Sequence, residues 1–332
     1  MKIDLVYTWV DPTNKEWMKE RNFYKGKNTD EATTGMCRYS SYDEIKYSMR
    51  SVFQNCNFIR NIYLVTNKGS RPKWLKEYPN VIIVDDKTIF PSDDMTPCYN
   101  SNAIESCLQN IPGLSEIFIY MNDDFLILTK LELTDLLTED KKKFIAFMET
   151  EPVFQMFSTS MFLSSIQDNI IRIPDKTMSA RNYTFQTVGV EPFTNPLAHC
   201  VRIYSKALIK EFEKKFFLQV NNTRYHRFRE ESSFCFCEGY ARHYEKMDLV
   251  KYKGDWYTKV IGLTDYPILN TAQIDLAKIY ANTYRFLCIE DGRTKFDEKE
   301  QQNMVDLLES LFPIKAPWEK GFEEERSKNK IL

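Results

Sequence analysis

The chain has 332 residues, 43% hydrophobic and 14% aromatic, which is enough apolar material for one large domain or two smaller ones. Its 45 Lys and Arg residues against 47 Asp and Glu residues leave a net charge of −2, which excludes the broad positive field of a nucleic-acid-binding protein. No apolar run approaches the roughly 20 residues that a membrane-spanning helix needs.

The N-terminal residues and the cysteines predict a cytoplasmic protein. The first residues, MKIDLVYTWVD, enter a strand pattern at once and lack the charged, apolar and small-residue regions of a signal peptide. The eight cysteines form no CxxC pair, so we expect neither a zinc site nor a disulfide framework, but reduced and mostly buried thiols. Peripheral attachment to the inner face of the cell membrane stays open, because the segment KGFEEERSKNK is too mixed in sign to identify a lipid anchor.

Apolar strands and amphipathic helices alternate through the first half of the chain. Ile3–Trp9 is predicted to be a strand that ends at Asp11-Pro12, and Ser41-x-x-Glu44 is a capping box that starts a helix through Phe53. Further strands are expected at Asn61–Thr66, Val81–Val84, Ile117–Met121 and Phe144–Met148, with a short helix over Asn102–Gln109. This order predicts an α/β fold, Rossmann-like or GT-A-like, with a mostly parallel sheet flanked by helices.

The second half has a different pattern. Residues 151–195 lack clear periodicity and are expected to form an irregular insertion or lid. Helices are expected over Ser205–Phe216, Glu230–Tyr244 and Glu298–Leu311, and 246–285 gives no clear prediction. The predicted organisation is therefore an α/β core over 1–150, the insertion over 151–195, a helical region over 196–320 and a charged tail over 321–332.

Two adjacent carboxylates interrupt the most apolar stretch, IFIYMNDDFL at Ile117–Leu126. Asp123 and Asp124 follow the end of a buried strand, where unpaired charge is costly unless a cation neutralises it. A divalent cation held against substrate phosphates is one solution, and an ordinary turn is the other. The parallel-sheet context favours a functional site, because such sheets bind ligands beyond the carboxyl ends of their strands.

Other polar residues follow the same strand ends. Tyr7, Thr8, Trp9 and Asp11 close the first strand, where an aromatic ring can stack on a base and Thr or Asp can reach ribose or phosphate; an ordinary strand end is the alternative. Asn67 and Lys68 follow the second strand, and Lys68 suits a phosphate or is simply solvated. Asn100, Ser101 and Asn102 lead into a helix, as an anion site or as plain caps.

His199 is one of three histidines, and it lies 25 to 30 residues before a basic cluster of Arg224, Arg227 and Arg229. A structural histidine and a solvated basic face are the simpler readings. If the cluster faces the crevice, one arginine can hold phosphoryl oxygens bidentately. The chain has no GxGxxG, Walker or GxSxG motif, which argues against NAD enzymes, P-loop kinases and α/β-hydrolases.

Taken together, the segments resemble the Stealth family of sugar-phosphate transferases. Four regions carry the resemblance: IDLVYTWVDPTNKEW at Ile3–Trp17, a long region over Arg38–Leu75 and Asn100–Leu126, Ala198-His199 through the arginine cluster to about Tyr244, and Phe286–Glu319. The long region contains RYSSYDEIKYSMRSVFQNCNFIRNIYLVTN and NSNAIESCLQNIPGLSEIFIYMNDDF. The chain departs from the family at Glu290-Asp291, where Asn-Asp is usual, and at Lys68.

The resemblance implies a reaction: a hydroxyl attacks the β-phosphorus of a UDP-sugar, sugar-1-phosphate is transferred, and UMP leaves. It also implies that core residues 1–150 bind the nucleotide sugar and that 196–320 complete the catalytic site. On this reading His199 is the general base, Arg229 stabilises the phosphoryl oxygens, and Asp123 and Asp124 hold Mg²⁺ or Mn²⁺ and the donor. The full expected set has catalytic His199, Arg229 and Asp124; metal ligands Asp123, Asp124 and Asp291; and substrate-binding Tyr7, Thr8, Trp9, Asp11, Glu44, Arg50, Asn67, Lys68, Asn100, Ser101, Asn102 and Asn122.

The expected partners are a UDP-sugar donor and a glycan or lipid-linked glycan acceptor, in capsular or other surface-polysaccharide synthesis. Two other functions fit the same residues. A GT-A glycosyltransferase would release UDP instead of UMP, and a non-catalytic protein would bind the nucleotide sugar without turnover.

Overall fold

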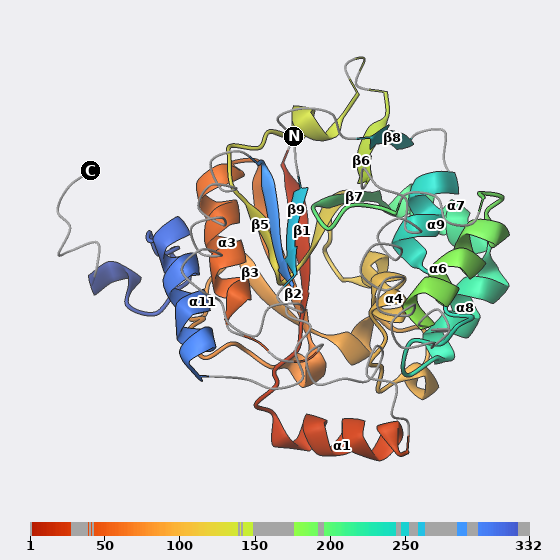
Figure 1. The fold of residues 1–332 in the computed structure, drawn as a ribbon, viewed down its shortest axis with the longest axis horizontal. Helices are drawn as coiled ribbons and strands as arrows, with labels where there is room; N and C mark the ends of the chain where they lie inside the picture. The colour runs from red at the N-terminus through yellow and green to blue at the C-terminus, as the bar shows by residue number, and fades with distance from the viewer. Residues whose placement is uncertain are drawn as a thin grey trace, which may run out of the picture.

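The computed structural model describes residues 2–27, 39, 41, 43–138, 140, 142–148, 176–191, 196–243, 247–251, 258–262, 284–290 and 298–324 (Figure 1). Its strands are β1 (Ile3–Trp9), β2 (Ile59–Thr66), β3 (Val81–Asp85), β4 (Ile117–Asn122), β5 (Phe125–Ile127), β6 (Phe144–Met148), β7 (Arg202–Ser205), β8 (Met247–Lys251), β9 (Thr258–Gly262) and β10 (Phe286–Glu290). Its α-helices are α1 (Lys15–Lys25), α3 (Glu44–Asn55), α4 (Ser101–Glu105), α6 (Lys176–Thr187), α7 (Lys206–Lys215), α8 (Phe217–Tyr225), α9 (Phe236–His243) and α11 (Glu298–Leu311).

The central sheet has the strand order β3-β2-β1-β4-β7. The pairs β1–β2, β1–β4 and β2–β3 are parallel, and β7 is an antiparallel edge strand beside β4. The predicted α/β class with a mostly parallel sheet flanked by helices is confirmed. The near-continuous apolar strand sequences follow from this arrangement, because a parallel sheet is covered on both faces.

Helices cover both sides of the sheet. Figure 1 shows α3 and α11 on one side, with α4, α6, α7, α8 and α9 on the other. The amphipathic pattern predicted for α11 is confirmed, since Met304, Leu307 and Leu308 are buried against Tyr47 of α3 and Leu126 of β5.

Two small sheets accompany the central one. In the first, β5 begins at the residue after Asp124 and pairs antiparallel with β10, which in turn pairs parallel with β9. In the second, β6 pairs parallel with β8. The strand predicted at Phe144–Met148 is therefore confirmed, but it belongs to a separate two-stranded sheet.

Three helices differ from the sequence prediction in their boundaries, one of them being α9, which begins at Phe236 and not at Glu230. Asp43, with φ 60°, is the N-cap of α3, so the predicted capping box is wrong in its first residue. Ser41 still donates its hydroxyl hydrogen bond to Glu44 Oε2, at 3.0 Å. The helix expected over Asn102–Gln109 is the shorter α4, followed by a separate 3₁₀ turn at Leu108–Asn110.

The second half is more ordered than its sequence pattern predicts. Helix α6 lies within the range 151–195, for which irregular structure is expected. Strand β7 precedes α7, and α8 follows α7 directly; neither β7 nor α8 has a clear pattern in the sequence. Ser205 caps α7 by accepting a hydrogen bond from the Leu208 backbone N–H, which separates strand from helix at that residue.

Two further expectations concern covalent state and membrane insertion. The seven cysteines that the structure describes are all buried, and none of them is in a disulfide. Among the described residues, no helix combines the length and apolar character needed to cross a bilayer.

Candidate active site

The parallel strands β1, β2, β3 and β4 end at the same edge of the central sheet. From β1 the chain proceeds outward to β2 and β3, then returns to the other side of β1 with β4. The strand order therefore reverses between β1 and β4, and the carboxyl ends beside such a reversal are the usual ligand site of an open α/β sheet. Thr8 and Asn122 are paired in register at this point, immediately before Asp123.

The ends of β1 and β2 are tied together by one buried amide. The Asp11 backbone N–H donates to Asn67 Oδ1 at 2.9 Å, and Asn67 is buried. The Asp11 carboxylate accepts from the Thr13 backbone and hydroxyl, at 2.9 and 2.7 Å. Asn67 Nδ2 is buried and has no hydrogen-bond partner among the described residues. Asp11 and Asn67 thus lie together, as the sequence predicts, and Asn67 shapes the loop.

A second hydrogen-bond chain joins the ends of β1 and β4. The hydroxyl groups of Thr8 and Tyr120 are 3.0 Å apart, and Tyr120 donates to Asn122 Oδ1 at 2.7 Å. The Thr8 and Asn122 side chains are therefore held by Tyr120 at the sheet edge. Tyr120 is not among the residues selected from sequence.

Asp123 and Asp124 lie half-buried in the turn between β4 and β5. Burial, with the adjacent Asp124 charge as the next contribution, raises the pKa of Asp123 to about 7. The Cys288 thiol donates to Asp124 Oδ2 at 3.4 Å, which places β10 beside the pair. Two adjacent carboxylates of this kind are stabilised when a cation binds them.

The donor set of this turn fits a hard divalent cation. Carboxylate oxygens are the ligands that Mg²⁺ takes from proteins, usually one or two of them, with phosphates and water completing the shell. In the described part of the chain, no group of three or more His, Cys, Asp or Glu residues could hold a metal ion. The third predicted ligand, Asp291, lies outside the described residues, directly after β10, whose antiparallel register with β5 runs toward the Asp pair.

The segment that carries His199 is fixed on both sides. Leu197 forms a β-bridge with Met148, and the Ala198 backbone N–H donates to the Phe147 carbonyl at 2.9 Å. The Leu197 N–H also donates to the buried carboxylate of Glu238, at 3.0 Å. A histidine placed on such a segment has little freedom to move, which suits a positioned acid or base.

The His199 ring packs edge-on against Phe125, with 6.2 Å between ring centroids. Since Phe125 follows Asp124, this contact places the predicted base against the residue that follows the predicted metal ligands. Burial is the largest cause that lowers the pKa of His199 to about 3, and the charges of Arg202, Arg181 and Arg229 contribute to the same shift. The imidazole is therefore neutral at physiological pH, in the form that can accept a proton.

Arg202 is the main site residue that the sequence does not predict. It forms an ion pair of 3.1 Å with buried Glu105, which also accepts from the Tyr204 hydroxyl at 2.5 Å. Its guanidinium lies 5.8 Å from the Tyr120 ring centroid and 6.0 Å from that of Phe125. A charged residue inside the apolar run VRIY was the available sequence signal. Arg181, on α6, was missed because irregular structure was expected there.

Arg229 lies at the same site through the start of α4. Its Nη2 donates to Ser101 Oγ at 2.8 Å, so these two predicted residues are in contact. Asn100 caps α4 by accepting from the Asn102 N–H, and it donates to the His226 carbonyl at 3.2 Å. Asn102 donates to the thiol of Cys235 at 3.5 Å. The two amides are buried and hold α4 in place, which is the capping alternative left open by the sequence.

Two predicted substrate-binding residues have structural positions instead. Tyr7 is fully buried, with its hydroxyl 2.8 Å from Ser48 Oγ, so no part of its side chain is available to a ligand. Arg50 is 1% exposed and binds Glu319 through Nε and Nη2, at 2.7 and 2.8 Å. The assignments of Tyr7 and Arg50 are corrected on this basis, because burial removes both side chains from solvent.

Three other predicted residues lie at this edge of the sheet: one is buried, one is in an ion pair, and one starts a helix. Trp9 is 5% exposed, and its Nε1 is buried without a hydrogen-bond partner among the described residues. Lys68 Nζ lies 3.3 Å from Glu20 of α1, in a half-exposed ion pair. Glu44 starts α3, whose N-terminus faces this edge because α3 connects parallel strands β1 and β2.

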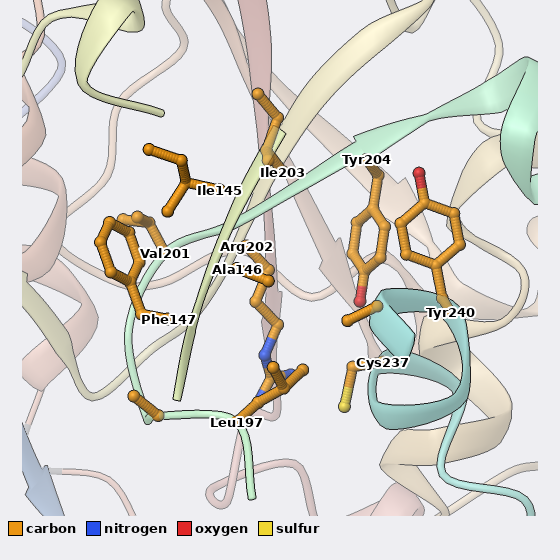
Figure 2. Close-up of a pocket in the computed structure, with 12 residues that line it drawn as sticks. Ile145, Ala146, Phe147, Leu197, Val201, Arg202, Ile203, Tyr204, Cys237 and Tyr240 are labelled. Atoms are coloured by element: carbon orange, nitrogen blue, oxygen red, sulfur yellow. The ribbon is translucent and has the colours of Figure 1, made fainter. Parts of the chain in front are cut away.

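A small cavity lies behind this site, and Figure 2 shows the side chains that line it. Arg202 extends from β7 toward Leu197, and Phe147, Tyr204 and Tyr240 form the surrounding wall. The cavity measures about 20 Å³, which is room for a single water molecule. It is too small for a nucleotide sugar, so the candidate substrate site is the open edge and not this cavity.

Comparison with known proteins gives two family matches. The model of Stealth protein CR1, conserved region 1, matches residues 1–29, and that of Stealth protein CR2, conserved region 2, matches residues 38–145. These ranges contain the first two of the four regions found by resemblance.

Individual relatives match over nearly the whole chain. Exopolysaccharide phosphotransferase CpsY of Mycobacterium tuberculosis is 28% identical over 96% of this chain and 58% of its own length. Capsular polysaccharide phosphotransferase SacB of Neisseria meningitidis serogroup A is 29% identical over 96% of this chain and 57% of its own length. The chain thus spans less than two thirds of both relatives. The crystal structure of the galactosyltransferase LgtC, with donor and acceptor sugar analogues, aligns with 98% of this chain and 100% of that one at TM-score 0.42 and 10% identity.

Proposed function

Because the chain belongs to the Stealth family, we propose that it transfers sugar-1-phosphate from a UDP-sugar to a hydroxyl of a glycan acceptor, with release of UMP. The relatives named exopolysaccharide and capsular polysaccharide phosphotransferases support a reaction in surface-polysaccharide synthesis. The acceptor would then be a growing glycan, free or lipid-linked.

One observation supports the proposal most strongly. The neutral imidazole of His199 packs on Phe125, the residue that follows Asp123-Asp124, while Arg202, Arg181 and Arg229 act on the same imidazole. A proton acceptor, a pair of carboxylates and several guanidinium groups in one place are the parts that phosphoryl transfer needs.

The proposed chemical step leaves the sugar's anomeric bond intact. The acceptor oxygen forms a bond to the β-phosphorus, its proton passes to His199, and the bond between the β-phosphorus and the bridging oxygen breaks. The electrons of that bond leave with UMP. The product is a phosphodiester with the anomeric configuration of the donor. Arg229 and Arg202 would stabilise negative charge on the phosphoryl oxygens.

Donor binding would also strengthen the base. In the protein alone, burial and then three arginine charges hold the pKa of His199 low, so the imidazole is a weak proton acceptor. A bound diphosphate would offset those positive charges and raise the pKa of His199 toward neutrality. The base would therefore become effective when the donor is in place, which limits proton uptake in its absence.

Asp123 and Asp124 would hold Mg²⁺ or Mn²⁺ at the end of β4. The cation, when bound, supplies positive charge that neutralises the diphosphate and the leaving UMP. The chain's own part is to keep both carboxylates in one turn, between β4 and β5. Thr8, Asp11 and Asn122, at the ends of β1 and β4, would face the nucleotide.

Identification of the nucleotide product tests the proposal. Purified protein, Mg²⁺, a panel of UDP-sugars and a glycan acceptor should give UMP and a new phosphodiester signal in phosphorus NMR. UDP together with a linkage free of phosphorus would mean glycosyl transfer and would overturn the proposal. Donor binding without either nucleotide product, across the panel, would favour a binding protein.

A further inference from the structure

The corner between α7 and α8 exposes an apolar pair. Helix α7 ends at Lys215 and α8 begins at Phe217, with Phe216 between them. Phe217 is 59% exposed and Leu218 is 68% exposed, although both are large apolar side chains. Tyr225, seven residues after Leu218 and so on the same helical face, is 47% exposed.

The corner is rigidly supported from inside. The buried Phe216 ring packs on Phe212 at 4.9 Å and on Phe234 at 5.8 Å between centroids, and His243 lies edge-on to it. Phe217 and Leu218 are therefore exposed on a helix whose start is held by well-packed neighbours.

Lysines surround the exposed pair. Lys210, Lys214 and Lys215 are exposed on α7, against one exposed acid, Glu211. The other acid of α7, Glu213, forms an ion pair with Arg224. The exposed face next to Phe217 is therefore both apolar and positively charged, whereas the chain as a whole has a net charge of −2.

We propose that this corner, Phe217 and Leu218 with Lys210, Lys214 and Lys215, binds the surface of an anionic lipid bilayer. Apolar side chains that enter the interface, with lysines at the level of the headgroups, are how a peripheral helix binds such a membrane. A second copy of the chain is a poorer occupant, because a stable protein interface buries on the order of 1,200 Å² or more and this apolar surface comprises three side chains.

The surface is separate from the candidate active site. Figure 1 shows α7 and α8 at the edge of the molecule opposite α11, with the central sheet between them. Binding through this corner would leave the carboxyl edge of the sheet uncovered. The inference does not depend on the proposed reaction, since vesicle binding can be measured without donor or acceptor.

Vesicle flotation of the whole chain tests the proposal. Vesicles of phosphatidylcholine with phosphatidylglycerol should carry the protein, pure phosphatidylcholine vesicles should carry ~10-fold less, and added salt should release it. The double variant Phe217→Ser/Leu218→Ser should lose ~10-fold or more of the bound fraction. Lys214→Glu/Lys215→Glu should lose binding to the anionic vesicles by a similar factor.

Ile314→Ser is the matched control, because Ile314 is 60% exposed and its carbonyl accepts from Gln54 of α3, a helix on the opposite side of the sheet. It should leave flotation unchanged, and thermal melting should confirm that every variant is folded. Equal binding of the wild type and both double variants would overturn the proposal. So would absence of wild-type binding, or light scattering that shows a dimer broken by Phe217→Ser/Leu218→Ser.

Discussion

His199 lies edge-on to Phe125, with their ring planes at 87°. Phe125 is the residue after Asp124, so a side chain from the segment before β7 is fixed against the end of the turn that follows β4. The acceptor side and the donor side of the proposed reaction meet through these two rings.

His199→Gln should abolish transfer while the donor still binds. Removing a general base typically costs ~10²–10⁴-fold in rate, because the proton of the attacking hydroxyl has no positioned acceptor. Turnover and calorimetric binding of the UDP-sugar would measure the two effects. His243→Gln is the control, since His243 packs on Phe216 away from this site. Turnover within a few-fold of wild type in His199→Gln would contradict the assignment.

Asp123→Asn should reduce kcat/KM by ~10²–10³-fold, a loss of several kcal/mol of charge stabilisation in the transition state. The metal-free variant should be more stable than wild type at pH 8. Folding raises the pKa of Asp123 from 3.8 to about 7, so the cost of this carboxylate to the folded state grows as the pH rises above about 3.8 and is complete above about 7. Urea unfolding in EDTA at pH 8 and pH 5 would show a gain at pH 8 that shrinks at pH 5. A less stable variant at pH 8 would contradict this reading.

Activity should depend on pH and metal together. Below about pH 7, Asp123 takes up a proton, and a protonated carboxyl cannot hold a cation well. At limiting Mg²⁺, kcat/KM should therefore fall as the pH drops through about 7, and higher Mg²⁺ should move this limb to lower pH. Chelation should stop the reaction at every pH. An acid limb that stays fixed at all Mg²⁺ concentrations, or full activity in EDTA, would rule out this role for Asp123.

Arg202→Gln should raise the pKa of His199, because it removes the largest charge contribution to its depression. The change leaves Glu105 buried without its cation, so Glu105→Gln/Arg202→Gln is the better-matched variant. NMR titration of the imidazole should give a pKa above the value of about 3 in the wild type, and turnover should fall ~10-fold or more. Lys142→Gln, which removes one member of an exposed ion pair with Asp140, is the control. An unchanged imidazole pKa would show that Arg202 does not act on His199.

Arg50→Ala should unfold the protein more easily without changing donor affinity. Arg50 and Glu319 are both buried, and losing one member of a buried pair costs about 3–5 kcal/mol. The midpoint of urea unfolding should drop, while the KM for the UDP-sugar in the folded protein stays within about two-fold, as expected for a residue that does not touch substrate. A ten-fold rise in KM with unchanged stability would restore the substrate-binding assignment made from sequence.

The parallel strands could be predicted because their surroundings leave a clear pattern. Both faces of β1, β2 and β4 are covered, so most of their residues are apolar. Strands β5 and β7 have three and four residues, too few for a pattern, and β7 contains Arg202. The partner that makes Arg202 tolerable there, Glu105, is 97 residues away, and sequence spacing gives no sign of such a pairing.

The sequence predicts the strand end at which a site residue lies, but not the face of the sheet to which its side chain points. Tyr7 and Thr8 are neighbours, but successive side chains of a strand point to opposite faces. Tyr7 therefore reaches Ser48 of α3, while Thr8 reaches Tyr120. The sequence places Tyr7 and Thr8 at the edge of the sheet but does not show which face each side chain points to. Arg50 shows the same limit, since its burial depends on Glu319, 269 residues later.

Pairing between β5 and β10 has a consequence for synthesis on the ribosome. Phe125 lies opposite Cys288, and the Cys288 thiol reaches Asp124 across 164 residues of chain. A nascent chain can form β1 to β4 early, yet the aspartate turn has no β10 beside it until translation has passed residue 288. The newly made protein should therefore acquire its donor site late, after most of the central sheet has already folded.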